Sequence, residues 1–412
     1  MASTVNILNL HSARTFCEIA ASSGITLENT PMRAAPLASL ALLLVVAGCA
    51  GAEFQHSPVP TTSVRPNGLS YPVADSSLGE SLYQNEQVLS GQIAASIEQS
   101  VREQYRNGNA RRDAHPKAHG CVTAEFHVND SLAERFATGI FIPGKTYQAW
   151  IRFSNGSQDA SRSDSKGDAR GMAIKLIGVP GKKLLENESN ATTQDFIMIN
   201  HPVFFANDPQ RYLSFIKKIN SDSFFEKLAV PFALGTTGSL IAWETISSKI
   251  SNPLHTRYWS MVPYQLGAGR EKQAVKFSAR SCSSVVESIP AKPSHDYLRD
   301  ALRNTLEQSA ACMEFLVQPR TGDSMDVEDS MVEWKESEAP FYQVATIHIP
   351  RQGFDTPEQN QFCENLSFSP WHALPEHRPL GAVNRLRKVI YEDISRVRHE
   401  MNSIERHEPQ TP

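Results

Sequence analysis

Between residues 120 and 349 the chain carries a series of short segments with the pattern of β-strands. Segment 146–154 alternates polar and apolar residues, and 171–177 and 194–199 are short apolar runs bounded by turn residues. The predicted strands are 120–128, 146–154, 171–177, 194–199, 273–279, 311–318 and 341–349. The predicted helices are 85–105, 208–219, 295–310, 357–365 and 384–402. Strands that come first, with helices inserted and then closing the chain, predict an α+β fold around an antiparallel sheet or barrel.

Composition narrows the classes of function. A chain of 412 residues with 40% hydrophobic and 20% charged residues is typical of a globular protein with one large or two smaller domains. Its formal net charge is −4, and we find neither a long Lys/Arg run nor a Cys/His zinc spacing. These features argue against nucleic acid as a partner.

The N-terminal region has the pattern of a targeting sequence. After Met32 and one arginine, an apolar run covers residues 36–46, and small residues lead to Cys49. The run is too short to span a membrane and is typical of a signal peptide, although a buried helix is the alternative. The ending Val46-Ala47-Gly48-Cys49 resembles a bacterial lipobox, which implies that Cys49 is lipidated and becomes the mature N-terminus.

This pattern predicts four parts of the chain. Residues 1–49 form the targeting segment, with translation starting at Met1 or Met32, and residues 50–83, rich in Ser, Thr, Pro and Gly, form a flexible tether. Residues 84–405 form one domain and 406–412 a tail. We therefore expect export to the bacterial cell envelope or periplasm, with membrane contact only through a lipid anchor at Cys49.

Four cysteines lie within the predicted domain. An oxidising compartment permits disulfides among Cys121, Cys282, Cys312 and Cys363, and four cysteines allow three pairings. Buried free thiols are the alternative.

Segment 384–402 predicts an amphipathic helix with one reactive side chain. Arg387 and Tyr391 are four residues apart and project from the same side, and Arg398 lies two turns beyond the tyrosine. Nearby guanidinium groups favour a phenolate, which is a ligand for ferric iron. The alternative is a solvated helix face with a partly buried tyrosine.

Three further groups of polar residues precede this helix. They are Arg112-Asp113-Ala114-His115-Pro116-Lys117-Ala118-His119-Gly120, then Arg152-Phe153-Ser154-Asn155-Gly156 with 167–175, and then 195–209. Taken singly, they are compatible with a solvated loop, a strand end with a turn, and an ordinary core segment.

Taken together, the four groups resemble the haem catalase family over about residues 100–402. Arg112 and His115 resemble the segment that carries the distal histidine. Arg152-Phe153-Ser154 resembles the family's Arg-Phe-Ser, and Asp168-Ala169-Arg170-Gly171 its Asp-Pro-Arg-Gly. Asn200-x-Pro202-Val203-Phe204-Phe205 is similar to the segment of the distal asparagine, and Arg387-x-x-x-Tyr391 with Arg398 to the proximal segment.

The resemblance implies a catalase-like antiparallel barrel, haem b as cofactor and a role for each matched residue. Tyr391 would be the iron ligand, with Arg387 and Arg398 on the same proximal side. His115 would be the distal base, oriented by Ser154, and Asn200 would orient the peroxide. Arg112 and Arg152 would bind the haem propionates, and Phe204 and Phe205 would form a haem wall. His119 and His201 fall beside motif positions and are expected to be structural.

The implied function is that of a haem-dependent hydroperoxidase. It would decompose hydrogen peroxide, reduce organic hydroperoxides, or both, in the response to oxidative stress. Its electron donor is unidentified, and a homo-oligomer is one option for its assembly. The chain ends about 20 residues after Tyr391, which is typical of a minimal catalase-related peroxidase without further C-terminal domains. The alternatives are a haem hydroperoxide isomerase or dehydratase that releases no oxygen, and a non-catalytic haem-binding envelope protein.

Overall fold

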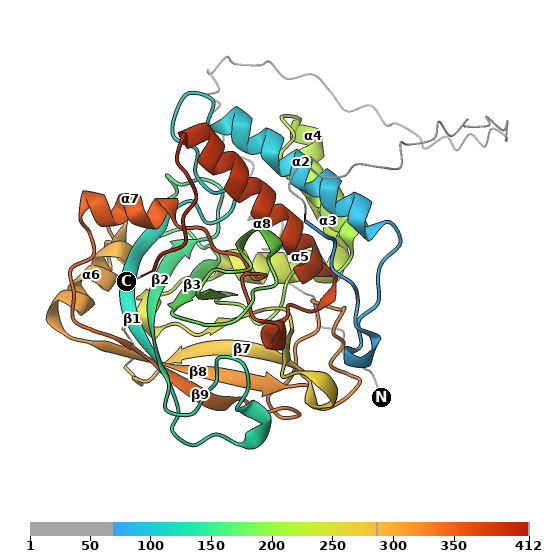
Figure 1. Ribbon diagram of the computed structural model, residues 1–412. Coiled ribbons are helices and arrows are strands. Elements are labelled where there is room, and N and C mark those ends of the chain that lie inside the picture. The colour runs from blue at the N-terminus through green and yellow to red at the C-terminus, as the bar shows by residue number, and fades with distance from the viewer. Residues whose placement is uncertain (1–68, 286, 411–412) are drawn as a thin grey trace, which may run out of the picture. The chain divides into compact units, whose positions relative to one another are not determined.

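An eight-stranded antiparallel β-barrel forms the centre of the protein (Figure 1). The computed structural model describes residues 69–285 and 287–410, so the predicted targeting segment, Cys49 and residues 50–68 lie outside the described part. Neighbouring strands follow the order β5-β4-β3-β2-β1-β9-β8-β7-β6. The pairing of β5 with β7 closes the first eight of them into the barrel, and β6 pairs with β7 outside it. The predicted α+β fold with an antiparallel barrel is confirmed.

The strands agree with the sequence pattern to within two residues, apart from two short additions. Their bounds are β1 Ala118–Val128, β2 Thr146–Asn155, β3 Arg170–Ile177, β4 Thr193–Ile199, β5 Tyr258–Trp259, β6 Tyr264–Leu266, β7 Gln273–Ser281, β8 Ala311–Pro319 and β9 Tyr342–Ile349. The additions are β5 and β6, whose two and three residues are too few to show a period of two.

Aromatic side chains fill the barrel. Phe196 lies 5.0 Å from Phe277 and 4.9 Å from Phe315, and Phe126 lies 5.0 Å from Phe315, between ring centroids. All four rings are buried. Because the barrel is a packed core, a ligand has to bind outside it.

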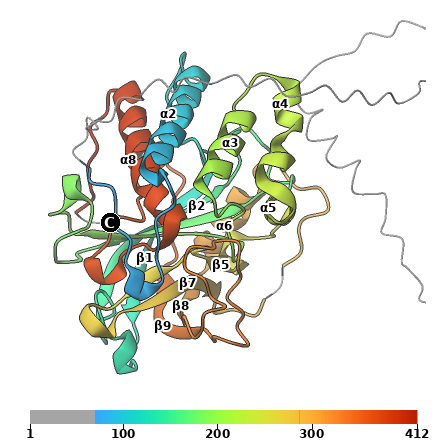
Figure 2. The same ribbon diagram turned by 90° about the vertical axis from the view of Figure 1, so that its right-hand side faces the viewer.

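Helices cover one side of the barrel, as Figure 2 shows. Helices α2 (Glu86–Gln104) and α8 (Gly381–Asn402) lie side by side in both views. Their apolar stripes meet through Ile93, Ile97, Leu386 and Val397, together with Leu213 of α3 (Pro209–Ile219). The remaining helices are α4 Phe224–Leu228, α5 Val230–Ser247, α6 Tyr297–Gln308 and α7 Pro357–Asn365.

Helices α4 and α5 were not predicted from the sequence. Helix α5 is apolar around most of its circumference and is interrupted at Gly235, whose φ is +70°, so it shows no amphipathic period. None of the helices in the described part of the chain is both long and apolar enough to cross a membrane.

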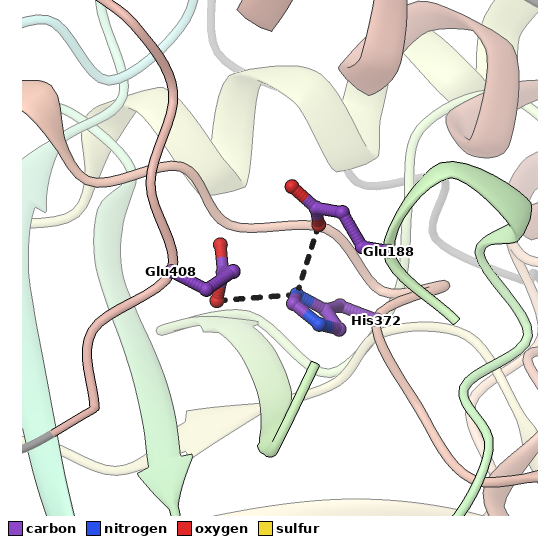
Figure 3. Close-up of side chains that lie close together, drawn as sticks. All are labelled: Glu188, His372 and Glu408. Carbon is purple, nitrogen blue, oxygen red and sulfur yellow. Dashed lines mark ion pairs between the residues drawn. The ribbon is translucent and has the colours of Figure 1, made fainter. Parts of the chain in front are cut away.

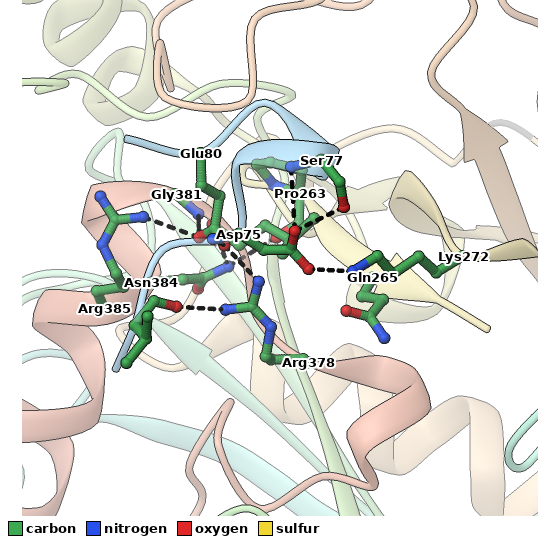
Figure 4. A network of polar contacts seen from close by, with 12 residues as sticks. Asp75, Ser77, Glu80, Pro263, Gln265, Lys272, Arg378, Gly381, Asn384 and Arg385 are labelled. Atoms are coloured by element: carbon green, nitrogen blue, oxygen red, sulfur yellow. Dashed lines mark hydrogen bonds and ion pairs between the residues drawn. The ribbon is translucent and has the colours of Figure 1, made fainter. Parts of the chain in front are cut away.

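Residues 69–83, which the sequence pattern places in the tether, pack against α8 (Figure 4). Arg385 donates to Glu80 at 2.8 Å, to Glu86 at 2.7 Å and to Glu328 at 2.9 Å, and all four side chains are buried. Glu80 also accepts from the backbone N–H of Gly381 at 2.8 Å. This network fixes the start of α8 to segments that lie far away in the sequence.

Two disulfides settle the open question of the cysteines. Cys121 of β1 is joined to Cys363 of α7, and Cys282 is joined to Cys312 of β8. The first ties the last turn of α7 to the barrel.

Candidate active site

His115 lies in the loop between α2 and β1, and two residues of strand β2 contact it. Its backbone is left-handed, with φ of +62°, which is uncommon for a residue other than glycine. Its Nδ1 lies 3.0 Å from Ser154 Oγ, and Arg152 donates to its carbonyl oxygen at 2.8 Å. The ring orientation predicted from Ser154 is therefore present.

Ser154 and Gly171, on neighbouring strands, lie against the His115 ring, and Ile199 continues the same row. Ser154 pairs with Gly171, and Gly171 pairs with Ile199, so their side chains point to the same face. Their neighbours Phe153 and Met172 are in the barrel core, which places this row on the outer face. A Cβ built on Gly171 would lie 2.6 Å from His115 Nδ1, so only glycine leaves space for the imidazole there.

The surroundings keep His115 neutral. Burial lowers the pKa of its imidazole to about 3, and the positive charges of Arg152, Arg112 and Arg387 add to this effect. In the tautomer whose Nδ1–H donates to Ser154 Oγ, the neutral imidazole has its lone pair on Nε2, which can then accept a proton.

Arg112, Arg152 and Arg398 form a buried or half-buried arginine cluster at the end of α7. Arg112 and Arg398 both donate to the carbonyl oxygen of Leu366, and Arg112 pairs with Glu364 at 3.0 Å. Burial, followed by repulsion from Arg112, lowers the pKa of Arg152 to about 9 and lowers that of Arg398 well below its usual value. The Nε of Arg152 is buried without a partner.

The charges of this arginine cluster are not balanced. Three guanidinium groups face one carboxylate, which leaves two positive charges in excess. Buried cations of this kind require anions close by. The cluster therefore suits a ligand with two carboxylates, which guanidinium groups bind well.

Helix α8 carries the Arg387–Tyr391 pair. Arg387 donates to the Tyr391 hydroxyl at 3.1 Å and to Asn384 at 3.0 Å, and its guanidinium lies 5.0 Å from the tyrosine ring centroid. Burial disfavours the charged guanidinium, but Tyr391 and Tyr264 outweigh this and raise the pKa of Arg387. The phenol oxygen is thus fixed next to a permanent positive charge, as a phenolate ligand requires.

An aromatic wall connects these parts. Phe204 and Phe205 have ring centroids 4.4 Å apart, and Phe205 packs on Phe215 of α3 at 5.1 Å. Burial raises the pKa of the neighbouring Tyr212, and the next contributions come from Asp113 and Tyr391. Tyr212 therefore lies near both the His115 loop and α8.

The side-chain hydrogen bonds of Asn200 are to Arg170 and Ser248 and not to His115. Its Oδ1 accepts from the backbone N–H of Arg170 at 2.6 Å, and its Nδ2 donates to Ser248 at 2.8 Å. Ile199, one residue earlier, is the residue in register with Gly171. His119 and His201 also have structural partners, Asn155 and the carbonyl oxygen of Val203 respectively.

Two contributors were missed from the sequence. Gly171 was noted only as part of a motif, and its role depends on a Cβ-sized space that no sequence pattern reveals. Asn384 lies three residues before Arg387, and this helical spacing was a signal that could have identified it.

Comparison with known proteins connects this geometry to one family. The catalase family model matches residues 92–232, a segment that includes His115, Ser154 and Gly171 but not α8. A search of curated protein sequences gives no match.

Solved structures of catalases share the fold. A fungal catalase is 18% identical with a TM-score of 0.56, covering 84% of this chain and 71% of that one. Catalase A from Saccharomyces cerevisiae is 19% identical with a TM-score of 0.53, over 71% of this chain and 62% of its own. A bacterial catalase is 17% identical with a TM-score of 0.53, over 87% and 71%.

Proposed function

We propose that the protein is a haem-dependent hydroperoxidase. Residues 92–232 of the chain belong to the catalase family, and its described part has the catalase fold. The observation that carries this proposal is the joint placement of a neutral His115, the arginine cluster and the Arg387–Tyr391 pair.

The residues present fit haem b. The two excess positive charges of Arg112, Arg152 and Arg398 match the two propionates, and the partnerless Nε of Arg152 is available to one of them. Tyr391 would supply the phenolate ligand for the iron, held by Arg387. Phe204 and Phe205 would pack against the macrocycle. The bound iron would supply the redox chemistry, oxidised by one peroxide and reduced by a second peroxide or an organic donor.

His115 would move the proton that cleavage of the peroxide requires. Its neutral Nε2 accepts a proton from one peroxide oxygen and returns it to the other oxygen, which leaves as water. Ser154 keeps the ring in position and Arg152 holds the backbone of His115, so the base does not have to reorganise.

Organic hydroperoxides are a second class of substrate that specific residues favour. Ile199 is apolar at the row position beside Gly171, and Phe204 and Phe205 add apolar surface. Such a surface suits the alkyl chain of an organic hydroperoxide. The same substrate would also fit an isomerase or dehydratase that acts on the hydroperoxide without releasing oxygen.

The first experiment is an absorption spectrum of the protein supplied with haem, followed by peroxide addition with an oxygen electrode. A ferric phenolate-type spectrum with oxygen release supports a catalase, and the same spectrum without oxygen supports a peroxidase or isomerase. The absence of a haem band would refute the proposal. His115→Ala should keep haem and lose most turnover, whereas Tyr391→Phe should change the iron spectrum and reduce haem retention.

We also propose export to the bacterial cell envelope with a lipid anchor, from the lipobox pattern at Cys49. Cys49→Ser should abolish membrane association in cell fractionation, with the His115→Ala protein as a matched control that still fractionates with membranes. A Cys49→Ser protein that remains with membranes would refute the anchor.

A further inference from the structure

Glu188, His372 and Glu408 form a three-residue cluster away from the candidate active site, and His372 is its buried member (Figure 3). They come from separate segments: Glu188 from a short helical turn (Glu186–Glu188), His372 from the loop after α7, and Glu408 from the chain after α8. Their potential ligand atoms all lie within 4.8 Å of one another. His372 is 0% exposed, whereas Glu188 and Glu408 are partly exposed.

The hydrogen bonds of Thr193 determine which nitrogen of His372 carries a proton. The Thr193 hydroxyl donates its only proton to Glu408 at 2.7 Å, because a carboxylate can only accept. Towards His372 Nε2, at 3.1 Å, the same hydroxyl must accept, so Nε2 carries the hydrogen. The Nδ1 of a neutral His372 then holds a lone pair, and it has no hydrogen-bond partner.

This lone pair faces carboxylate oxygens. His372 Nδ1 lies 3.4 Å from Glu408, 3.5 Å from Glu188 and 3.8 Å from Asp195. A lone pair that points at anionic oxygens is unfavourable unless a cation lies between them.

The direct ion pairs around the cluster leave negative charge in excess. Among the residues that the structure describes, the four carboxylates of Glu188, Asp195, Glu392 and Glu408 form ion pairs with two side-chain cations, Lys175 and Arg406. The charge count allows one divalent cation.

We propose that Glu188, His372 and Glu408 bind a divalent transition-metal ion of the Zn²⁺ class. One imidazole nitrogen with carboxylate oxygens is a common ligand set for this ion. The separations of 3.4 and 3.5 Å agree with the ligand-to-ligand edge of about 3.3 Å in a tetrahedron with bonds of about 2.0 Å. The 3.4 Å separation is to Oε2 of Glu408, which also accepts from Thr193 and Lys175, whereas Oε1 of the same carboxylate has no hydrogen-bond partner. The hydrogen bond from His372 Nε2 to Thr193 fixes the orientation of the ring, as a bond to the nitrogen that does not bind the metal does in other histidine ligands.

The bound ion would act as a structural clamp. It would join the chain end after α8 to the loop after α7 and to the Glu186–Glu188 turn, so loss of the ion should release the C-terminal segment first. This inference is independent of haem and of peroxide turnover.

The test uses the full-length protein after treatment with a chelator, titrated with ZnCl₂ by isothermal calorimetry. One tight site is expected, with a rise of a few degrees in Tm on addition of Zn²⁺. His372→Gln should weaken this site by at least about 100-fold, and Glu408→Gln by at least about tenfold. Glu405→Gln removes an exposed carboxylate of the same C-terminal segment and should bind Zn²⁺ as the parent does.

Two results would overturn the inference. Unchanged Zn²⁺ affinity in both His372→Gln and Glu408→Gln would mean that the ion binds elsewhere. Absence of tight binding, together with an NMR signal of His372 with protons on both ring nitrogens, would mean that a proton occupies the space between the carboxylates. If His372→Gln does not fold, Glu408→Gln, whose residue lies outside the helices and strands, decides the question alone.

Discussion

Gly171→Ala tests the placement of His115 most directly. The added Cβ would lie 2.6 Å from His115 Nδ1, 2.7 Å from its Cε1 and 2.8 Å from Ser154 Oγ. Gly171 lies within β3 and its backbone is not left-handed, so alanine itself is tolerated by the main chain. The substitution therefore acts on the imidazole and the hydroxyl.

The size of the effect follows from these distances. An ordinary contact needs about 3.4 Å, so the ring has to retreat by roughly 0.8 Å from a Cβ at 2.6 Å. This movement disturbs the 3.0 Å contact between His115 and Ser154. A displacement of about 1 Å in a catalytic group can cost about 100-fold in rate. Overpacking should lower the free energy of unfolding by about 1–3 kcal/mol.

The assay is oxygen release or donor oxidation per haem, measured with haem content and denaturant unfolding on the same preparation. We expect turnover to fall by about 100-fold while haem is retained, because the arginine cluster and Tyr391 lie on other segments. Gly322→Ala is the control, since a Cβ there meets nothing within 4 Å. Parental turnover in Gly171→Ala would refute the role of this row in orienting a distal base.

Three further predictions address other parts of the chain. Asn200→Ala should lower the unfolding free energy by about 1–3 kcal/mol through loss of its bonds to Arg170 and Ser248. A loss of turnover as large as that of His115→Ala would contradict this structural role of Asn200. Burial lowers the pKa of His377 to about 3, so the unfolded state takes up a proton that the folded state excludes as pH falls below 6.5. Relative to His377→Gln, the parent should lose about 1.4 kcal/mol of unfolding free energy per pH unit in that range. Equal pH dependence of the denaturation midpoints in the two proteins would refute this prediction. Loss of the Cys121–Cys363 disulfide, which spans 242 residues, should cost about 5 kcal/mol, against about 4 kcal/mol for Cys282–Cys312, which spans 30; the reverse order of denaturation midpoints would contradict this.

Much of the fold could be predicted because the barrel strands carry strong local patterns. Strand β2 alternates and is flanked by turn residues, and its predicted and observed bounds differ by one residue. The docking of residues 69–83 could not be predicted. Glu80 and Arg385 are 305 positions apart in the sequence, and a local residue pattern cannot indicate a contact of that kind.

The candidate site was predictable in its residue types but not in its register. His115, Ser154 and the Arg387–Tyr391 pair follow from motifs, and the structure shows the expected contacts. Asn200 follows the end of β4, and its contacts with Arg170 and Ser248 come from tertiary structure, so its role in orienting peroxide stays a prediction. The pairing of β3 with β4 decides that Ile199 joins the row, and only the structure contains that pairing.

The Cys121–Cys363 disulfide has a consequence for the arginine cluster. Cys363 is next to Glu364, and the carbonyl oxygens that receive Arg112 and Arg398 follow within three residues. With the thiols reduced, this segment would lose its covalent tie to β1 and would be held by side-chain packing and by the hydrogen bond from Gln359 to the carbonyl oxygen of Cys121. Oxidation should therefore place the acceptors of the guanidinium groups more rigidly and strengthen the binding of a dianionic ligand.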